Sequence, residues 1–167
     1  MSENDAVIWS KEICLKWSDF KAESNPAIFE DSHSSIKYRF TWIVDSDKQN
    51  DDIVFSIDKI SVTVEFNPLL SWVRESESTD NLLIHEQGHF DLAEMLRGHN
   101  DAQRKQFAKE DSGKMISIEI DKLSNILKQK RNQYDTETEF GSNIKNQLQY
   151  NEIFKKLKIQ CHHFVYQ

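Results

Sequence analysis

The stretch of sequence from residue 82 to residue 94 reads LLIHEQGHFDLAE. It contains the pattern His-Glu-x-x-His. On an α-helix, residues four apart lie one turn apart on the same face, so His85 and His89 can both present an imidazole nitrogen to one Zn²⁺. Glu86 lies beside them, where a carboxylate can take a proton from water as general base. The stretch therefore predicts a helix that carries two metal ligands and the base of a metallohydrolase.

The residues around the motif favour a buried helix. Thr79, Asp80 and Asn81 can cap its start. Apolar residues after the motif recur at three- and four-residue spacing, at Phe90, Ala93, Met95 and Leu96. Gly88 costs about 1 kcal/mol relative to alanine inside a helix, so a packing or functional reason is expected. The alternative interpretation is a buried helix whose histidines only make hydrogen bonds.

A catalytic zinc needs three protein ligands and an open position, so a third ligand must be found. At about 100° per residue, Glu94 points roughly 180° away from His85, and Asp91 is about 120° off. His99 returns to a similar face but lies about 21 Å along the helix axis. None of the three can join His85 and His89 on an unbroken helix. The third ligand is therefore expected from elsewhere in the chain.

The first 75 residues have strand character, and the rest of the chain is helical. Strands are expected at residues 13–17, 35–44 and 53–66, the last with a turn or bulge at Asp58-Lys59. Polar, loop-like segments cover residues 21–34 and 45–52, and Asn67-Pro68 ends the strand region.

Three helices are expected after the strands. The motif helix begins near Asp80 and extends beyond Arg97, as far as Lys109 at most. A second helix is indicated by the spacing of Ile116, Ile120, Leu123 and Leu127, although residues 115–118 alone also fit a strand. A third follows Gly141, with Tyr150, Ile153, Phe154 and Leu157 on its apolar face. We therefore expect an α+β fold in a single domain, residues 1–167, with a small N-terminal antiparallel sheet followed by three helices.

Composition excludes several classes of partner. The net charge is −7 and the isoelectric point is near 5.4, which argues against a nucleic-acid partner. No apolar run is long enough to span a membrane, and the composition gives no oligomeric state.

The chain shows no secretory signal, which fits either an intracellular protein or a mature fragment. Cys14 and Cys161 either form one disulfide or are free thiols.

Four further segments and Gln147 carry a resemblance that covers nearly the whole chain. The segments are LKWSDF (15–20), SIKY (35–38), FNPLLSWV (66–73) and YDTET (134–138). With the motif stretch, they resemble a bacterial family of largely uncharacterised proteins described as predicted secreted zinc-dependent proteases. The resemblance implies a zincin-like fold, zinc as cofactor, a peptide or protein substrate, and a periplasmic or extracellular location.

One departure from this family concerns the third zinc ligand. The family signature usually runs Tyr-Asp-x-x-Thr-x-His-Gly, and its histidine is the candidate ligand, but Phe140 occupies that position here. The resemblance then places a replacement ligand in the same signature, with Glu137 first, Asp135 second and Glu139 also acceptable. Histidines elsewhere are further candidates: His33, His162 and His163. Alternatively, these carboxylates cap a helix or hold a ligand histidine.

Two functions from different classes follow. The first is a zinc-dependent metallopeptidase with Glu86 as general base, in which Tyr134 either donates a hydrogen bond to the oxyanion or is a buried structural residue. The second is a non-catalytic zincin-like binding module with a weak or lost metal site, which Phe140 motivates directly. A purely structural metal site is a third option and needs a fourth protein ligand.

Overall fold

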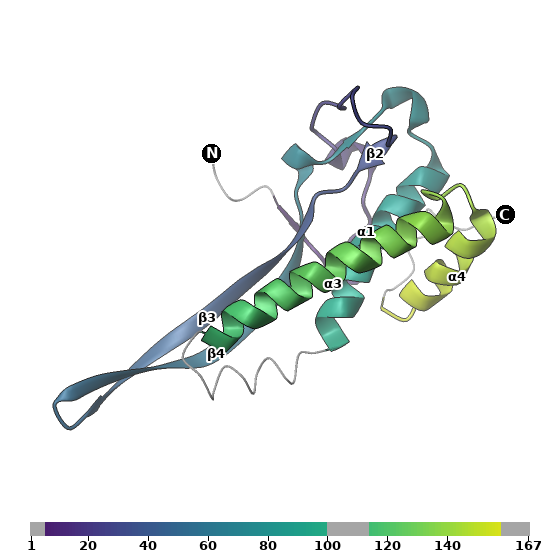
Figure 1. Cartoon of the computed structure of the whole chain (residues 1–167). Helices are drawn as coiled ribbons and strands as arrows, with labels where there is room; N and C mark the ends of the chain where they lie inside the picture. The colour runs from purple at the N-terminus through teal and green to yellow at the C-terminus, as the bar shows by residue number, and fades with distance from the viewer. Residues whose placement is uncertain (1–5, 100–113, 158–167) are drawn as a thin grey trace.

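The computed structural model describes residues 6–99 and 114–157 and shows antiparallel strands followed by helices (Figure 1). The three-stranded sheet has the order β1-β4-β3, with β1 at Val7–Ile8, β4 at Asp52–Phe66 and β3 at Ile36–Gln49. A second, two-stranded sheet pairs β2 (Ser32–His33) with β5 (Trp72–Val73). All pairings are antiparallel. The expected α+β class is confirmed.

Strands β3 and β4 form a long hairpin whose base packs against the helices and whose distal end projects beyond them (Figure 1). Gln49 pairs with Asp52, so the turn consists of Asn50 and Asp51, and Asn50 adopts a φ of 57°. Such a left-handed conformation is what a two-residue hairpin turn requires, and asparagine tolerates it. The loop expected over residues 45–52 is therefore wrong: most of it is strand. The polar composition suggested a loop because the distal part of a projecting two-stranded ribbon buries neither face, so its strands need no apolar residues.

The irregularity expected at Asp58-Lys59 is a bulge. Ile43 pairs with Lys59 and Val44 with Ile57, so Asp58 is left without a partner residue. An extra residue of this kind bends a strand without ending it. The segment from 52 to 66 is therefore one strand.

The segment 13–17 is not the strand that its alternation predicts. Leu15 is buried, and its backbone N–H donates to Gln87 Oε1 at 2.8 Å. A short 3₁₀ helix, η2 (Trp17–Asp19), follows. A side chain of the motif helix thus satisfies a backbone group that a sheet would otherwise pair.

The strand region ends as expected and leads into the helices. β4 ends at Phe66, and the Asn67 side chain caps the 3₁₀ helix η3 (Pro68–Leu70) by accepting from Leu69 N at 3.0 Å. Another short 3₁₀ helix, η4 (Glu75–Glu77), leads towards the motif helix.

The three expected helices are present. The motif helix α1 spans Asp80–His99, and the Thr79 hydroxyl accepts from Leu82 N at 3.2 Å near its start. Helix α3 spans Lys114–Thr138, so the strand alternative for residues 115–118 is wrong. Helix α4 spans Ile144–Phe154. The expected extension of the motif helix towards Lys109 lies outside the described residues.

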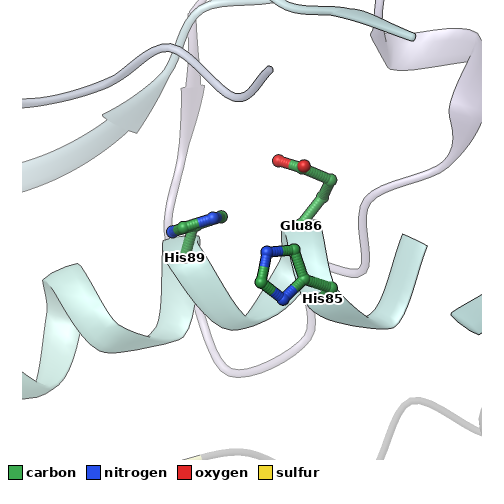
Figure 2. A group of neighbouring side chains, drawn as sticks. All are labelled: His85, Glu86 and His89. Atoms are coloured by element: carbon green, nitrogen blue, oxygen red, sulfur yellow. The ribbon is translucent and has the colours of Figure 1, made fainter. Parts of the chain in front are cut away.

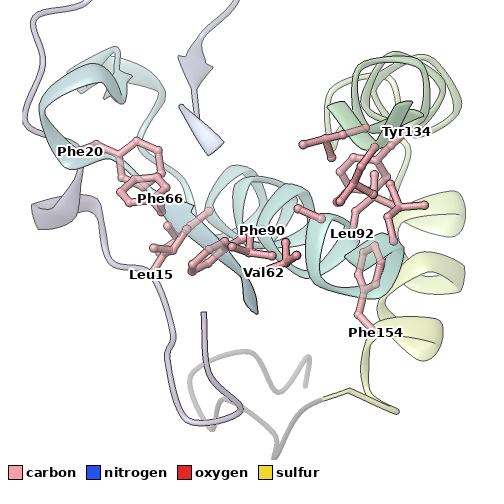
Figure 3. Packing of buried hydrophobic residues seen from close by; sticks show 14 residues of the cluster. Leu15, Phe20, Val62, Phe66, Phe90, Leu92, Tyr134 and Phe154 are labelled. Carbon is pink, nitrogen blue, oxygen red and sulfur yellow. The ribbon is translucent and has the colours of Figure 1, made fainter. Parts of the chain in front are cut away.

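Helix α1 is the centre of the structure. It contacts β4 as well as α3 and α4, and every residue from 83 to 93 is buried. The core runs continuously from the N-terminal segment through α1 to α4 (Figure 3). Its buried aromatic members are Phe20, Phe66, Phe90, Tyr134 and Phe154. Since α1 is enclosed on all sides, its polar residues need partners within the protein.

Two of these polar residues clamp the N-terminal segment to α1. Gln87 accepts from Leu15 N and donates to Asp91 Oδ1 at 3.0 Å, and Asp91 Oδ1 also accepts from Trp9 Nε1 at 2.8 Å. Asp91 therefore holds the N-terminal segment, whereas its angular position on the helix predicted only that it does not join His85 and His89.

Two further findings bear on the wider setting. None of the helices that the structure describes is long and apolar enough to cross a membrane. Cys14 is disulfide-bonded. The other cysteine, Cys161, lies outside the described residues.

Candidate metal centre

His85 and His89 lie one turn apart on α1, and both are buried, with 1% and 3% of their surface exposed. Their ring centroids are 4.8 Å apart with an interplanar angle of 80°. Potential ligand atoms of His85, Glu86 and His89 all lie within 4.8 Å of one another (Figure 2). The helix thus brings its three motif residues to one point.

Asp135 on α3 meets both histidines. Its Oδ1 atom lies 3.1 Å from His85 Nε2 and 2.9 Å from His89 Nε2. Two imidazole nitrogens and one carboxylate oxygen form a donor set that suits a catalytic zinc. Asp135 Oδ1 thus faces both Nε2 atoms, whereas the two oxygens of Glu86 accept hydrogen bonds from Ser32 and Ser34.

The protonation of this cluster suits metal binding. Burial lowers the pKa of His89, and the hydrogen bond to Asp135 opposes that shift only in part. Burial alone would raise the pKa of Asp135, but its contacts with His85 and His89 outweigh burial and lower that pKa overall. The unprotonated carboxylate and the neutral imidazole are the forms that bind metal.

Two side chains fix the tautomer of His85. Nδ1 lies 3.1 Å from Gln147 Oε1 and 3.2 Å from Thr138 Oγ1. The Thr138 hydroxyl donates its proton to Tyr134 O at 2.7 Å, and Gln147 Nε2 donates to Tyr134 Oη at 2.7 Å. Both groups facing Nδ1 are therefore acceptors, so Nδ1 carries the proton and donates.

The tautomer of His85 indicates whether a cation fits between this histidine and Asp135. With the proton on Nδ1, the lone pair of His85 Nε2 faces Asp135 Oδ1 at 3.1 Å, an acceptor opposite an acceptor. Only a cation between the two atoms, either a second proton or a metal ion, makes that approach favourable. The residues present therefore fit a metal ion. In the described part of the chain, His89 Nδ1 has no hydrogen-bond partner.

Tyr134 packs against His85 and holds it in place. Its side chain is fully buried, and its ring stacks on His85 at 4.6 Å with an interplanar angle of 7°. The hydroxyl donates to the backbone carbonyl of His85 at 3.1 Å, and burial raises the pKa of Tyr134 well above its usual range. The one hydroxyl proton is thus already committed to His85 O, which argues against the alternative in which Tyr134 donates to an oxyanion. The buried structural alternative describes Tyr134.

Close packing explains the glycine of the motif. A Cβ on Gly88 would lie 2.0 Å from Tyr134 Oη and 2.7 Å from Tyr134 Cζ. No other residue fits without displacing the tyrosine. The packing reason expected for Gly88 is thus present.

The carboxylate of Glu86 is held by two serines. Ser32 Oγ donates to Oε1 at 2.5 Å, and Ser34 Oγ donates to Oε2. Each carboxylate oxygen can accept more than one hydrogen bond, so lone pairs remain for a proton from water. The pair of serines fixes the orientation of Glu86 at the wall of the cavity.

Glu137, the first candidate for the third ligand, does not reach the histidines. Its side chain accepts from Tyr150 Oη at 2.5 Å and from Gln133 Nε2 at 2.7 Å. These hydrogen bonds lower the pKa of Glu137. Two residues along a helix turn the side chain by about 200°, so Glu137 points away when Asp135 points in. The order of the two candidates is therefore corrected in favour of Asp135.

The other ligand candidates are placed as follows. His33 stacks on Trp72 with 6.4 Å between ring centroids and lies 3.8 Å from Glu30. Glu139 accepts from Asn143 Nδ2 at 3.3 Å. His162 and His163 lie outside the described residues.

Phe140 and Gly141 border the site where α3 ends. Phe140 is 54% exposed and lines the cavity. Gly141 has a φ of +86°, and a Cβ there would lie 2.7 Å from His85 Cβ. The chain reverses tightly over the buried histidine, and only glycine suits both the space and the conformation.

The site opens into a cavity of about 730 Å³. Residues of β2, β3, α1 and α3 line it, and His85, Glu86, His89 and Asp135 are among them. A cavity of this size accommodates a ligand of several residues or a drug-sized molecule.

Sequence reasoning missed the residues that hold Glu86 and His85 in place. Ser32 and Ser34 are two apart, which on a strand places both on one face, and this spacing was the available signal. Gln147 and Thr138 lie within or beside the resembling segments, yet nothing local indicates that they bind His85. Their role depends on how α3 and α4 pack on α1.

No protein-family model, curated protein or solved structure matches this chain. Its function is therefore inferred from the geometry and chemistry of the site.

Proposed function

We propose that this chain is a zinc-dependent peptidase with His85, His89 and Asp135 as metal ligands. One observation carries the proposal. Asp135 Oδ1 lies 3.1 Å from His85 Nε2 and 2.9 Å from His89 Nε2, and the carboxylate of Glu86 lines the same cavity. Peptide as substrate is supported by the sequence resemblance to predicted secreted zinc-dependent proteases, and the zincin-like assignment belongs to the same proposal.

The residues divide the chemistry among them. When bound, zinc supplies Lewis-acid chemistry that lowers the pKa of water and polarises a carbonyl. Gln147 holds the Nδ1 proton of His85 and so keeps Nε2 available. Ser32 and Ser34 orient Glu86, which accepts a proton from water in the cavity and delivers it to the leaving amine.

The proposal includes export to the periplasm or the extracellular space. The disulfide at Cys14 supports it, because disulfides persist in oxidising compartments and are rare in the cytosol.

Metal content tests the ligand set. We expect one zinc per chain after dialysis against zinc, and loss of that zinc in His89→Ala and Asp135→Ala. Removing a ligand should weaken zinc binding by more than the roughly 10–100-fold that loss of an outer-shell partner costs. Glu137→Ala is the matched control, since it removes the same charge from the same helix but from a side chain held by Tyr150. Wild-type zinc affinity in Asp135→Ala would contradict the assignment.

Hydrolysis tests the activity separately. Zinc-loaded wild type should cleave casein or a peptide library, and Glu86→Gln should bind zinc but not cleave. A zinc-bound wild type that cleaves neither would point to a structural metal site. A wild type that binds no zinc would favour the non-catalytic binding module.

A further inference from the structure

Helix α3 brings two basic side chains to the same cavity. Lys128, Arg131 and Asp135 all line it, and their spacing of three and four residues places them along one face of the helix. Arg131 lies one turn from the carboxylate that meets the histidines. A positive group thus stands beside the proposed reaction centre.

Arg131 has hydrogen-bonding capacity to spare. It is partly buried, and its Nη2 donates to Ser34 O at 2.8 Å. The guanidinium has five N–H donors. Within the described residues it forms no ion pair with a carboxylate, although the charges of Glu86, Asp135 and Glu30 act on it at longer range. Its remaining donors are available to a ligand.

Two acidic residues that line the cavity, Asp31 and Glu30, lie close to other basic side chains. Asp31 lies 3.5 Å from Arg74, and Glu30 lies 3.8 Å from His33. Their positions leave Arg131 as a cation at the cavity wall without a direct counter-ion among the described residues.

We propose that Arg131 binds a carboxylate of the substrate, which makes this end of the cavity selective for an acidic peptide group. The inference rests on the proposed peptidase function. A planar guanidinium binds a carboxylate through two parallel hydrogen bonds, and Lys128 adds a positive charge one turn along the helix. The carboxylate belongs either to an Asp or Glu side chain or to the C-terminus of the peptide.

A positioning role is the competing explanation. Arg131 holds the carbonyl of Ser34, and the hydroxyl of Ser34 holds Glu86. Loss of such a support would affect all substrates alike. Loss of a carboxylate-binding residue would affect only the acidic ones, so the ratio between matched peptides separates the two roles.

Binding of three labelled decapeptides to the full-length Glu86→Gln variant provides the test, read by fluorescence polarisation. The first peptide has one central Glu and an amidated C-terminus, the second has Gln and a free C-terminus, and the third has Gln and an amidated C-terminus. Charge-assisted hydrogen bonds contribute about 1.5–3 kcal/mol, so one of the first two should bind at least about tenfold more tightly than the third. The peptide that does so identifies the source of the carboxylate.

The Arg131→Gln substitution, added to Glu86→Gln, should abolish that preference. Lys130→Gln is the matched control, because it removes the same charge from an exposed neighbour on the same helix that donates to Gln133. It should leave the preference intact. Arg131→Lys keeps the charge but loses the planar fork, so it should retain a reduced preference, and it serves if Arg131→Gln does not fold.

Two results would overturn the proposal. One is the absence of any carboxylate preference in the Glu86→Gln protein, whether the peptides bind equally or not at all. The other is a preference that survives in Arg131→Gln or that stays at full strength in Arg131→Lys. Failure of the peptidase function looks different, because the carboxylate preference would then be present while the zinc-loaded wild type cleaves no peptide.

Discussion

Substitution of Gly88 by alanine gives the sharpest test of how helix α1 is held in place. The added Cβ would lie 2.0 Å from Tyr134 Oη, 2.7 Å from Tyr134 Cζ and 3.3 Å from Phe154 Cε2. The first two distances are shorter than any real contact, so Tyr134 must move. Its hydroxyl would then lose its alignment with His85 O and with Gln147 Nε2.

The expected cost follows from three contributions. Overpacking a closed core costs about 1–3 kcal/mol, and disturbing the buried hydrogen bonds of Tyr134 costs about 1–2 kcal/mol. Alanine is favoured over glycine in a helix by about 1 kcal/mol, which offsets part of this. We expect Gly88→Ala to lower the free energy of unfolding by about 1–4 kcal/mol.

Urea unfolding of the metal-free protein, followed by circular dichroism, measures this change. Gly98→Ala is the control on the same helix, because Gly98 is exposed and a Cβ there meets nothing within 4 Å. It should gain about 0.5–1 kcal/mol from helix propensity alone. The two alanines should therefore change stability in opposite directions.

A second variant identifies the clashing atom. Tyr134→Phe removes the hydroxyl that lies nearest to the new Cβ, so it should partly rescue Gly88→Ala with a coupling of about 0.5–3 kcal/mol. Equal stability of Gly88→Ala and wild type would refute the reasoning. So would strictly additive effects of the two substitutions.

Three further outcomes are expected. Ser34→Ala leaves one oxygen of Glu86 without its hydroxyl, so it should lower the free energy of unfolding by about 1–3 kcal/mol with zinc stoichiometry unchanged; loss of zinc would contradict this. Tyr150→Phe removes the main hydrogen bond that lowers the pKa of Glu137, so carboxyl ¹³C NMR should show that pKa rising towards 4.5. In the wild type, this contact stabilises the folded state above pH 4.5, and the stabilisation is lost as the pH falls through the lowered pKa. Phe140→Ala should leave zinc affinity unchanged, because Phe140 is 54% exposed and supplies no ligand atom; weaker zinc binding on titration would show that the phenylalanine supports the site.

The sequence predicted the helices well because their apolar spacing is local. The start of α1 at Asp80 and the bulge at Asp58 are both features whose causes lie within a few residues. The strand predicted at residues 13–17 is wrong because the cause of its conformation is not local. Its alternation is real, but Leu15 takes its backbone partner from Gln87, 72 residues away.

The candidate site also has a part that local sequence predicts and a part that depends on tertiary packing. The spacing of His85, Glu86 and His89 follows from helical geometry alone. The choice between Asp135 and Glu137 depends on which face of α3 turns towards α1, and the resemblance to a family signature cannot supply that rotation. Burial of Tyr134 is likewise a consequence of tertiary packing.

The clamp between the N-terminal segment and α1 has a consequence for the order of folding. The hydrogen bonds from Trp9 to Asp91 and from Leu15 to Gln87 close loops of 82 and 72 residues. Contacts between residues so far apart in sequence form slowly, because the entropy of closing the loop is lost before the contact is gained. The proposed ligands come from α1 and α3, and Asp135 is 50 residues from His85, so a complete ligand set also needs a contact between residues far apart in sequence. Acquisition of a metal ion should therefore be a late event in folding, and its rate should report on assembly of the whole protein rather than on formation of one helix.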